Sequence, residues 1–222
     1  GSSGQAPIPD GNHCKKYQIN TQTLVAHVEP SGSNFGSFQS GSGLQSAFVK
    51  KLYELTNRDI ICFKTAMGGT SASQWSTTLS TESLDYLAAA PSNIKDANIE
   101  PILVYFQGEA DAVAINQSSE TKAQYKSYVT TTINKWRAVN GATAKVFLIK
   151  VGYSTYAQDN GTDTVNLGLL ELADSMTNVY IAFNASALDP TINKPFQDQQ
   201  HFNQTGLNNI GVGAAILIAS VL

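Results

Sequence analysis

The segment DQQHFN places a carboxylate and an imidazole three residues apart, at Asp198 and His201. At that spacing the carboxylate can accept a hydrogen bond from imidazole Nδ1, which fixes the ring tautomer and leaves Nε2 free as a base. The other two histidines of the chain, His13 and His27, have no such setting. An aspartate that caps a helix ahead of a surface histidine would give the same pattern. The pair therefore indicates acid–base chemistry only in combination with other groups.

Two further segments carry groups suited to a developing negative charge. Gly68 and Gly69 end an apolar run, and a glycine there lets a backbone N–H point at an oxyanion without obstruction from a Cβ. Gln107 ends a second apolar run, ahead of Glu109 and Asp111, and its side-chain NH2 could donate to the same oxyanion. A tight turn and a hydrogen-bonded buried amide are the structural alternatives.

The elements around these residues follow an alternating pattern from Gly43 onward. The strand segments are continuous apolar runs, which is typical of a sheet covered on both faces. The pattern predicts one α/β domain over residues 1–222, a three-layer α/β/α sandwich with a mainly parallel central sheet. The first forty residues have a weaker pattern and are expected to run as an ordered excursion over the surface. The expected helices are 43–55, 80–90, 119–139, 164–176 and 206–222, and the expected strands are 59–66, 99–106, 144–154 and 178–183.

Such a sheet brings the polar segments together. In open α/β sheets, ligands bind in the crevice at the carboxyl ends of the strands. The glycine pair, the Gln107 segment and the His201 segment each follow a predicted strand. We therefore expect one site that combines glycine, amide, carboxylate and imidazole groups.

Composition narrows the class of protein. Charged residues make up 14% of the chain and the net charge is -3, with no clustered Lys or Arg, so no nucleic-acid or anionic membrane surface is expected. Cys14 and Cys62 lack metal-ligand spacing, and a disulfide between them is a minor alternative to a buried thiol at Cys62. No transmembrane helix is expected, and the neutral, hydroxyl-rich surface favours an extracellular or virion-associated protein.

Three blocks of the sequence together resemble one family. AMGGTSASQW (66–75), YFQGEADA (105–112) and DQQHFN (198–203) stand in the order seen in SGNH hydrolases, and are most similar to the sialate O-acetylesterase-like branch of carbohydrate esterases. The segments YQINTQTLVAHVEP and SGLQSAFVKKL also look like that family, so the resemblance spans most of the chain. Tyr105 departs from the pattern, because the family often has Trp there.

The resemblance implies an acyl-transfer site without metal or cofactor. His201 would be the general base and then the acid, with Asp198 as its orienting partner. The backbone N–H of Gly69 and the side chain of Gln107 would donate to the tetrahedral oxyanion. Gly68, Glu109 and Asp111 would support this site, the two carboxylates by anchoring Gln107 and the neighbouring loops.

The nucleophile has three possible assignments. In the family it sits in a G-x-S motif after the first central strand, and GSSG at the start of the chain fits that block with Ser3 as nucleophile. The central strand would then come from residues outside this sequence or from another chain. In the rival assignment, Ser33 follows a first strand at 23–28 that lies, parallel, between strands 59–66 and 99–106. The third possibility is that residues 1–4 are a cloning tag and the chain has no nucleophile. Ser3 is the favoured assignment.

The expected function is that of a carbohydrate O-acetylesterase acting on acetylated glycans through a serine acyl-enzyme. The alternative is a glycan-binding module that keeps the fold without turnover.

Overall fold

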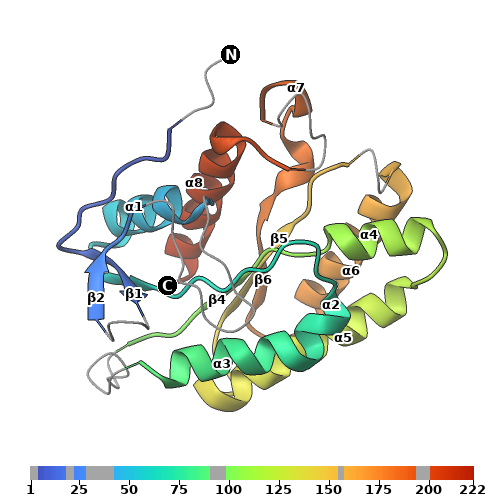
Figure 1. Cartoon of the computed structure of the whole chain (residues 1–222), viewed down its shortest axis with the longest axis horizontal. Coiled ribbons are helices and arrows are strands. Elements are labelled where there is room, and N and C mark those ends of the chain that lie inside the picture. The colour runs from blue at the N-terminus through green and yellow to red at the C-terminus, as the bar shows by residue number, and fades with distance from the viewer. Residues whose placement is uncertain (1–4, 19–22, 29–42, 91–98, 155–157, 194–200) are drawn as a thin grey trace. The chain divides into compact units, whose positions relative to one another are not determined.

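The computed structural model describes residues 5–18, 23–28, 43–90, 99–154, 158–193 and 201–222, and its helices and strands are shown in Figure 1. The chain divides into two compact units, and we describe each by itself. The first is built from Gly1–Met67, Asp85–Asp96 and Asp189–Leu222, and the second from Gly68–Leu84 and Ala97–Leu188. The expectation that residues 1–222 form one domain stays a prediction.

The sheet of the first unit has the order β2-β1-β3. Its strands are β1 (Cys14–Gln18), β2 (Thr23–Ala26) and β3 (Ile60–Cys62). β1 pairs antiparallel with β2 and parallel with β3. The strand expected at 59–66 is thus present in shorter form.

The surface excursion expected for the first forty residues is wrong where the β1–β2 hairpin lies. The sequence of β1 is CKKYQ, and its charged residues hide the apolar pattern of a buried strand. In the structure Cys14, Lys16 and Tyr17 are all buried, and Lys16 Nζ donates to the carbonyl oxygen of Val28 at 3.1 Å. A lysine whose ammonium finds a backbone acceptor can therefore occupy a strand position that reads as polar.

The hairpin also corrects the structural premise of the Ser33 assignment. That assignment required residues 23–28 to form a parallel strand between two others. β2 is instead antiparallel to β1 and lies at one end of the strand order.

Helices α1 (Gln45–Thr56) and α8 (Gln204–Val221) pack closely in the first unit. A Cβ added at Gly211 would lie 2.5 Å from the carbonyl oxygen of Leu44, so the glycine permits the close approach. Among the described helices, α8 is the one long and apolar enough to cross a membrane, by length and composition only. One such helix is weak evidence, since core helices pass the same test. The short α7 (Pro190–Asn193) precedes it.

The last part of α3 (Ser80–Ala88) joins the first unit through a pair of tyrosines. The Tyr86 hydroxyl donates to the Tyr17 carbonyl oxygen at 2.7 Å, and the Tyr17 hydroxyl donates to the Ala89 carbonyl oxygen at 2.9 Å. The two buried hydroxyl groups are thereby satisfied while their rings add to the core.

The sheet of the second unit is entirely parallel, with the order β4-β5-β6. Its strands are β4 (Leu103–Tyr105), β5 (Val146–Lys150) and β6 (Val179–Asn184). Val146, Phe147, Leu148 and Ile149 of β5 are all fully buried. Because successive side chains point to opposite faces, the central strand is covered on both faces, as its unbroken apolar sequence predicted.

Helices α4 (Glu109–Asn116), α5 (Lys122–Asn140) and α6 (Gln158–Ser175) accompany this sheet in the second unit (Figure 1). Val146 and Leu148 share one apolar cluster with residues of α5 and α6 such as Val129, Val165 and Leu169. The fold is therefore of the predicted α/β class with mainly parallel strands. The other described elements of the second unit are α2 (Ala72–Gln74), the π-helix η1 (Trp75–Leu79) and the 3₁₀ turn η3 (Ala185–Ala187).

Candidate active site

Gln107 lies just beyond β4 and has its whole amide group engaged. Its Nε2 donates to the Thr70 carbonyl oxygen at 3.0 Å and to Asp111 Oδ2 at short range, while its Oε1 accepts from the Tyr105 hydroxyl at 2.8 Å. An amide nitrogen carries two hydrogens, so both are used. The carbonyl oxygen of Thr70 can only accept, which fixes the orientation of the amide. Gln107 thus ties the exit of β4 to the loop that contains Thr70.

Asp111, in the first turn of α4, binds the same loop from another side. Both of its carboxylate oxygens accept from the Ala72 backbone N–H, at 2.9 and 3.0 Å, and the residue is fully buried. Ala72 is the first residue of helix α2 (Ala72–Gln74), where a backbone N–H has no acceptor within its own helix, and the Asp111 carboxylate supplies that acceptor. Burial raises the pKa of Asp111, while the hydrogen bonds from Gln107 and Ala72 act in the opposite direction.

The backbone around Gln107 is also fixed. The Tyr125 hydroxyl donates to the Gln107 carbonyl oxygen at 3.1 Å. Gly108 has φ +147°, and a Cβ there would lie 2.7 Å from Val165 Cγ1 and 3.0 Å from the Tyr125 hydroxyl oxygen. Only glycine fits this turn, for both its conformation and its space. Burial raises the pKa values of Tyr105 and Tyr125 well above the usual value, so both hydroxyl groups remain donors.

The loop that Gln107 and Asp111 hold begins with the two glycines. Gly68 and Gly69 are exposed, and Gly69 adopts the left-handed conformation with φ +72°. A Cβ added at either glycine would meet no atom within 4 Å. Among the described residues, no hydrogen bond uses the backbone N–H of either glycine. The loop that carries the two glycines is therefore held by hydrogen bonds to Gln107 and Asp111 and has open space beside both glycines.

The loop over residues 68–72, called the glycine loop below, is also stabilised by two local hydrogen bonds toward its C-terminal end. The Ser71 N–H donates to Gln74 Oε1 at 2.9 Å in a capping box that starts α2. Trp75 Nε1 donates to Thr70 Oγ1 at 3.0 Å. The GGTSASQW block thus forms a capped turn rather than a free loop, which limits the freedom of the exposed N–H groups.

Of the predicted site residues, Gly68, Gly69, Gln107, Glu109 and Asp111 lie in the second unit. The structure joins Gln107 and Asp111 directly, and both contact the glycine loop. Glu109 is the first residue of α4, where a negative charge is favourable.

The other predicted site residues either lie outside the described residues or belong to the first unit. Ser3, Ser33 and Asp198 lie outside the described residues. His201 is exposed and belongs to the first unit, two residues before Asn203, whose side chain caps α8 by accepting from Gly206 N–H at 2.9 Å. Its position in the loop before α8 agrees with the sequence-based expectation.

Sequence reasoning did not identify three residues that support this site. Tyr105 was noted only as a departure from the family pattern, although its hydroxyl binds Gln107. Tyr125 and Glu120, whose carboxyl group shares a hydrogen bond with Asp111, lie in a predicted helix and at its start, and nothing in their spacing connects them to Gln107 or Asp111. Amphipathic periodicity could identify Tyr125 as a core residue but not the partner of its hydroxyl.

Comparisons with known proteins agree with the fold and the motifs. Residues 11–218 match the family model described as carbohydrate esterase, sialic acid-specific acetylesterase. The solved structure of a protein from Arabidopsis thaliana is similar with a TM-score of 0.75 at 16% identity, covering 96% of this chain and 82% of that one. An acetyl esterase mutant with an acetate ion gives a TM-score of 0.51 at 16% identity, covering 74% of this chain and 73% of that one. A carbohydrate esterase family 3 protein from Talaromyces cellulolyticus gives 0.51 at 14% identity, covering 77% of this chain and 90% of that one. No curated protein matches the chain in sequence.

Proposed function

The chain belongs to the sialic acid-specific acetylesterase family of carbohydrate esterases, and we propose that it removes acetyl groups from an acetylated sugar through a serine acyl-enzyme. Family membership supports an acetylesterase activity in general, and the resemblance to sialate O-acetylesterase-like carbohydrate esterases drawn from the motifs is confirmed. The observation that carries the proposal is the glycine loop. It exposes Gly68 and Gly69, while Gln107 binds its Thr70 and Asp111 binds its Ala72.

The proposed reaction has two steps. The serine oxygen attacks the acetyl carbonyl carbon while His201, oriented by Asp198, takes the serine proton. The oxyanion formed in this step receives hydrogen bonds from the glycine loop, with Gly69 N–H as the first donor. When the sugar oxygen leaves with the proton from His201, an acetyl-serine remains. Water then releases acetate and restores the serine by the same proton path.

The role of Gln107 in this scheme follows from its hydrogen bonds. A direct bond from Gln107 to the oxyanion would require one amide hydrogen to leave Thr70 or Asp111, since both are used. We therefore propose that Gln107 mainly holds the glycine loop through Thr70. Direct donation, as the resemblance implies, stays a prediction. For Gln107→Ala, a lower kcat at unchanged thermal stability would indicate direct donation. A fall in both would indicate the holding role.

The proposed base is tested by His201→Ala, with His13→Ala as a matched control. His13 is another histidine of the first unit, half-buried, and pairs with Asp59 at the surface. With p-nitrophenyl acetate and a panel of O-acetylated sugars, His201→Ala should lower kcat about 10⁴-fold or more. His13→Ala should leave it unchanged. Activity of His201→Ala within about tenfold of the parent would refute the assignment.

The nucleophile is tested by labelling with a fluorophosphonate and mapping of the labelled peptide. The Ser3 assignment expects the label on the peptide that contains Ser3, and loss of labelling in Ser3→Ala. Label on Ser33 would favour the rival assignment, although β2 does not provide the parallel strand that it needs. No label on folded protein would favour a glycan-binding module instead.

We also propose an extracellular or virion-associated setting, which the hydroxyl-rich composition supports. Fractionation of the source material with an antibody against the chain would test it, and a purely cytosolic signal would refute it.

A further inference from the structure

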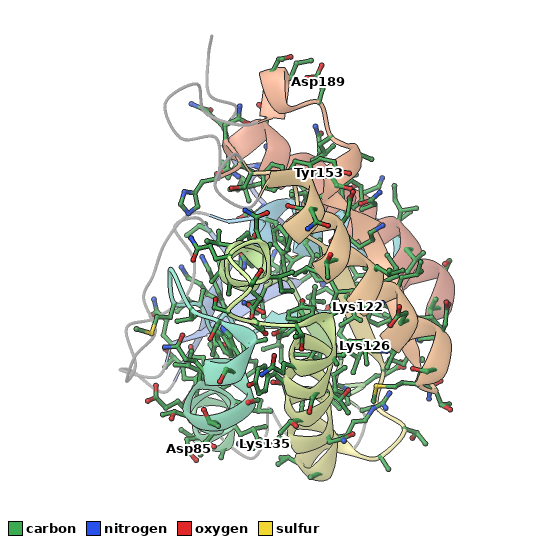
Figure 2. All side chains as sticks on the ribbon, turned by 90° about the vertical axis from the view of Figure 1, so that its right-hand side faces the viewer. Asp85, Lys122, Lys126, Lys135, Tyr153 and Asp189 are labelled. Carbon is green, nitrogen blue, oxygen red and sulfur yellow. The ribbon has the colours of Figure 1, made fainter. Side chains whose placement is uncertain are left out.

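Asp111 and Glu120 form a hydrogen-bonded pair of carboxyl groups beside the glycine loop. Asp111 is fully buried, and among the described residues no N–H or hydroxyl group donates a hydrogen bond to the buried Glu120 Oε1. Within the described part of the chain neither carboxyl group forms an ion pair. Lys122, two residues after Glu120, binds Glu171 of α6 together with Lys126 (Figure 2). Two carboxyl groups in contact, without a cation, cannot easily both carry a charge.

The hydrogen-bond donors decide which of the two carries the proton. Asp111 accepts from Ala72 N–H and from Gln107 Nε2, and these donors favour its charged form. Glu120 has only Asp111 as a partner. The proton therefore resides on Glu120, which donates to Asp111. Burial, followed by the charge of Asp111, raises the pKa of Glu120 to about 7.

The other titratable groups near Asp111 and Glu120 do not change the conclusion that the pair holds one proton. Tyr105 from the end of β4 and Tyr125 from α5 face Asp111, and burial holds both in the neutral form because their pKa values are raised. Glu109 on α4 adds a further negative charge near both tyrosines, which disfavours a second carboxylate there. The pair thus has one exchangeable proton near neutral pH.

We propose that Glu120 is a positioning residue, whose proton holds Asp111 in place and through it Gln107, Ala72 and the glycine loop. The hydrogen bond from Glu120 gives Asp111 a third partner beside Gln107 and Ala72. When Glu120 ionises, the proton passes to solvent and two carboxylates repel each other within the support of the loop. The effect on catalysis depends on the proposed esterase activity, whereas the proton-sharing pair does not.

The direction of the pH effect follows from the raised pKa. The folded protein prefers protonated Glu120, so the support is complete at acidic pH and is lost as the pH rises through about 7. A general base acts in the opposite sense, because it loses activity when the pH falls. Glu120 should therefore shape the alkaline side of the activity profile.

The test uses Glu120→Gln, whose amide can donate to Asp111 at every pH, with Glu54→Gln as the matched control. Glu54 is exposed on α1 and pairs only with surface lysines. In the parent, kcat at pH 9 should fall up to about 100-fold below its value at pH 6 if activity requires protonated Glu120. For Glu120→Gln the fall should be less than about threefold. Glu54→Gln should behave as the parent.

A second readout tests the pair without relying on activity. Infrared spectra of the parent across pH 5 to 9 should show a protonated carboxyl group that titrates near pH 7, which Glu120→Gln should lack. In Asp111→Asn that titration should move toward lower pH, because the neighbouring charge is gone. If Glu120→Gln keeps the titration of the parent, the proposal is wrong even if the protein is an esterase. If the infrared result holds and no esterase activity exists, the proton-sharing pair stands and the proposed function fails.

Discussion

Gly108 offers a direct test of how rigidly the site is built. Alanine at this position would have to adopt φ +147°, and its Cβ would overlap Val165 Cγ1 at 2.7 Å. An unfavourable backbone conformation costs about 1–3 kcal/mol. Overpacking a well-filled interior costs about 1–3 kcal/mol more. Displacement of the Tyr125 hydroxyl, 3.0 Å from the added Cβ, would also weaken its hydrogen bond to Gln107, worth about 1 kcal/mol. We expect Gly108→Ala to lower the free energy of unfolding by about 3–7 kcal/mol.

Gly141→Ala is the matched control for the backbone contribution. Gly141 also has a positive φ, +109°, but an added Cβ would meet no atom within 4 Å. Its cost should therefore be only the conformational part, about 1–3 kcal/mol. Urea unfolding followed by fluorescence and circular dichroism gives both free energies, and the difference between the two variants isolates the steric overlap.

The steric explanation would be contradicted by an equal loss of stability in Gly108→Ala and Gly141→Ala. If both variants lose the same stability, the contact with Val165 is relieved at no cost and the turn is not tightly packed. The double variant Gly108→Ala with Val165→Ala adds a check, because removal of the overlapping methyl group should make the two changes less costly together than their sum. Strict additivity would contradict the reasoning.

Three further changes test other parts of the structure. Asn166 binds both backbone groups of Val151, accepting from its N–H at 2.9 Å and donating to its carbonyl oxygen at 3.0 Å. Asn166→Leu should therefore cost about 3 kcal/mol in urea unfolding, and a loss below about 1 kcal/mol would contradict this. Burial and nearby lysine charges lower the pKa of His27 to about 4, so stability should fall as the pH drops from about 6.5 toward 4. His27→Leu should remove this acid-sensitive part, about 3 kcal/mol, and an unchanged pH dependence of unfolding would exclude His27 as its source. Gly211→Ala would place a Cβ 2.5 Å from a backbone oxygen at the start of α1 and should lower the thermal midpoint. Gly168→Ala, whose Cβ would approach only side chains at 3.3 Å, should lower it less, and the reverse order would refute the packing argument.

The apolar runs of the sequence were sufficient to predict several elements. β5 lies within the expected strand 144–154 and α5 nearly coincides with the expected helix 119–139. β5 is an unbroken apolar run covered on both faces, and α5 has apolar residues at helical spacing on its buried face, so local pattern and tertiary packing agree. β1 failed this test because Lys16 is buried with its ammonium bound to a backbone oxygen. Only a tertiary acceptor makes such a lysine compatible with a core strand.

The candidate site also has a part that the sequence predicted and a part that only the tertiary structure showed. The order of the glycine pair, the QGEAD segment and His201 along the chain was enough to predict strand-exit groups, since parallel strands bring their carboxyl ends to one edge. The sequence does not show which acceptors bind the Gln107 amide hydrogens or which carboxyl group shares a proton with Asp111. Both depend on distances between residues that lie apart in the sequence. Sequence determined the types of group available for acyl transfer. Tertiary structure alone decided that Thr70 and Asp111 occupy the Gln107 amide, because hydrogen-bond partners are set by packing and not by spacing along the chain.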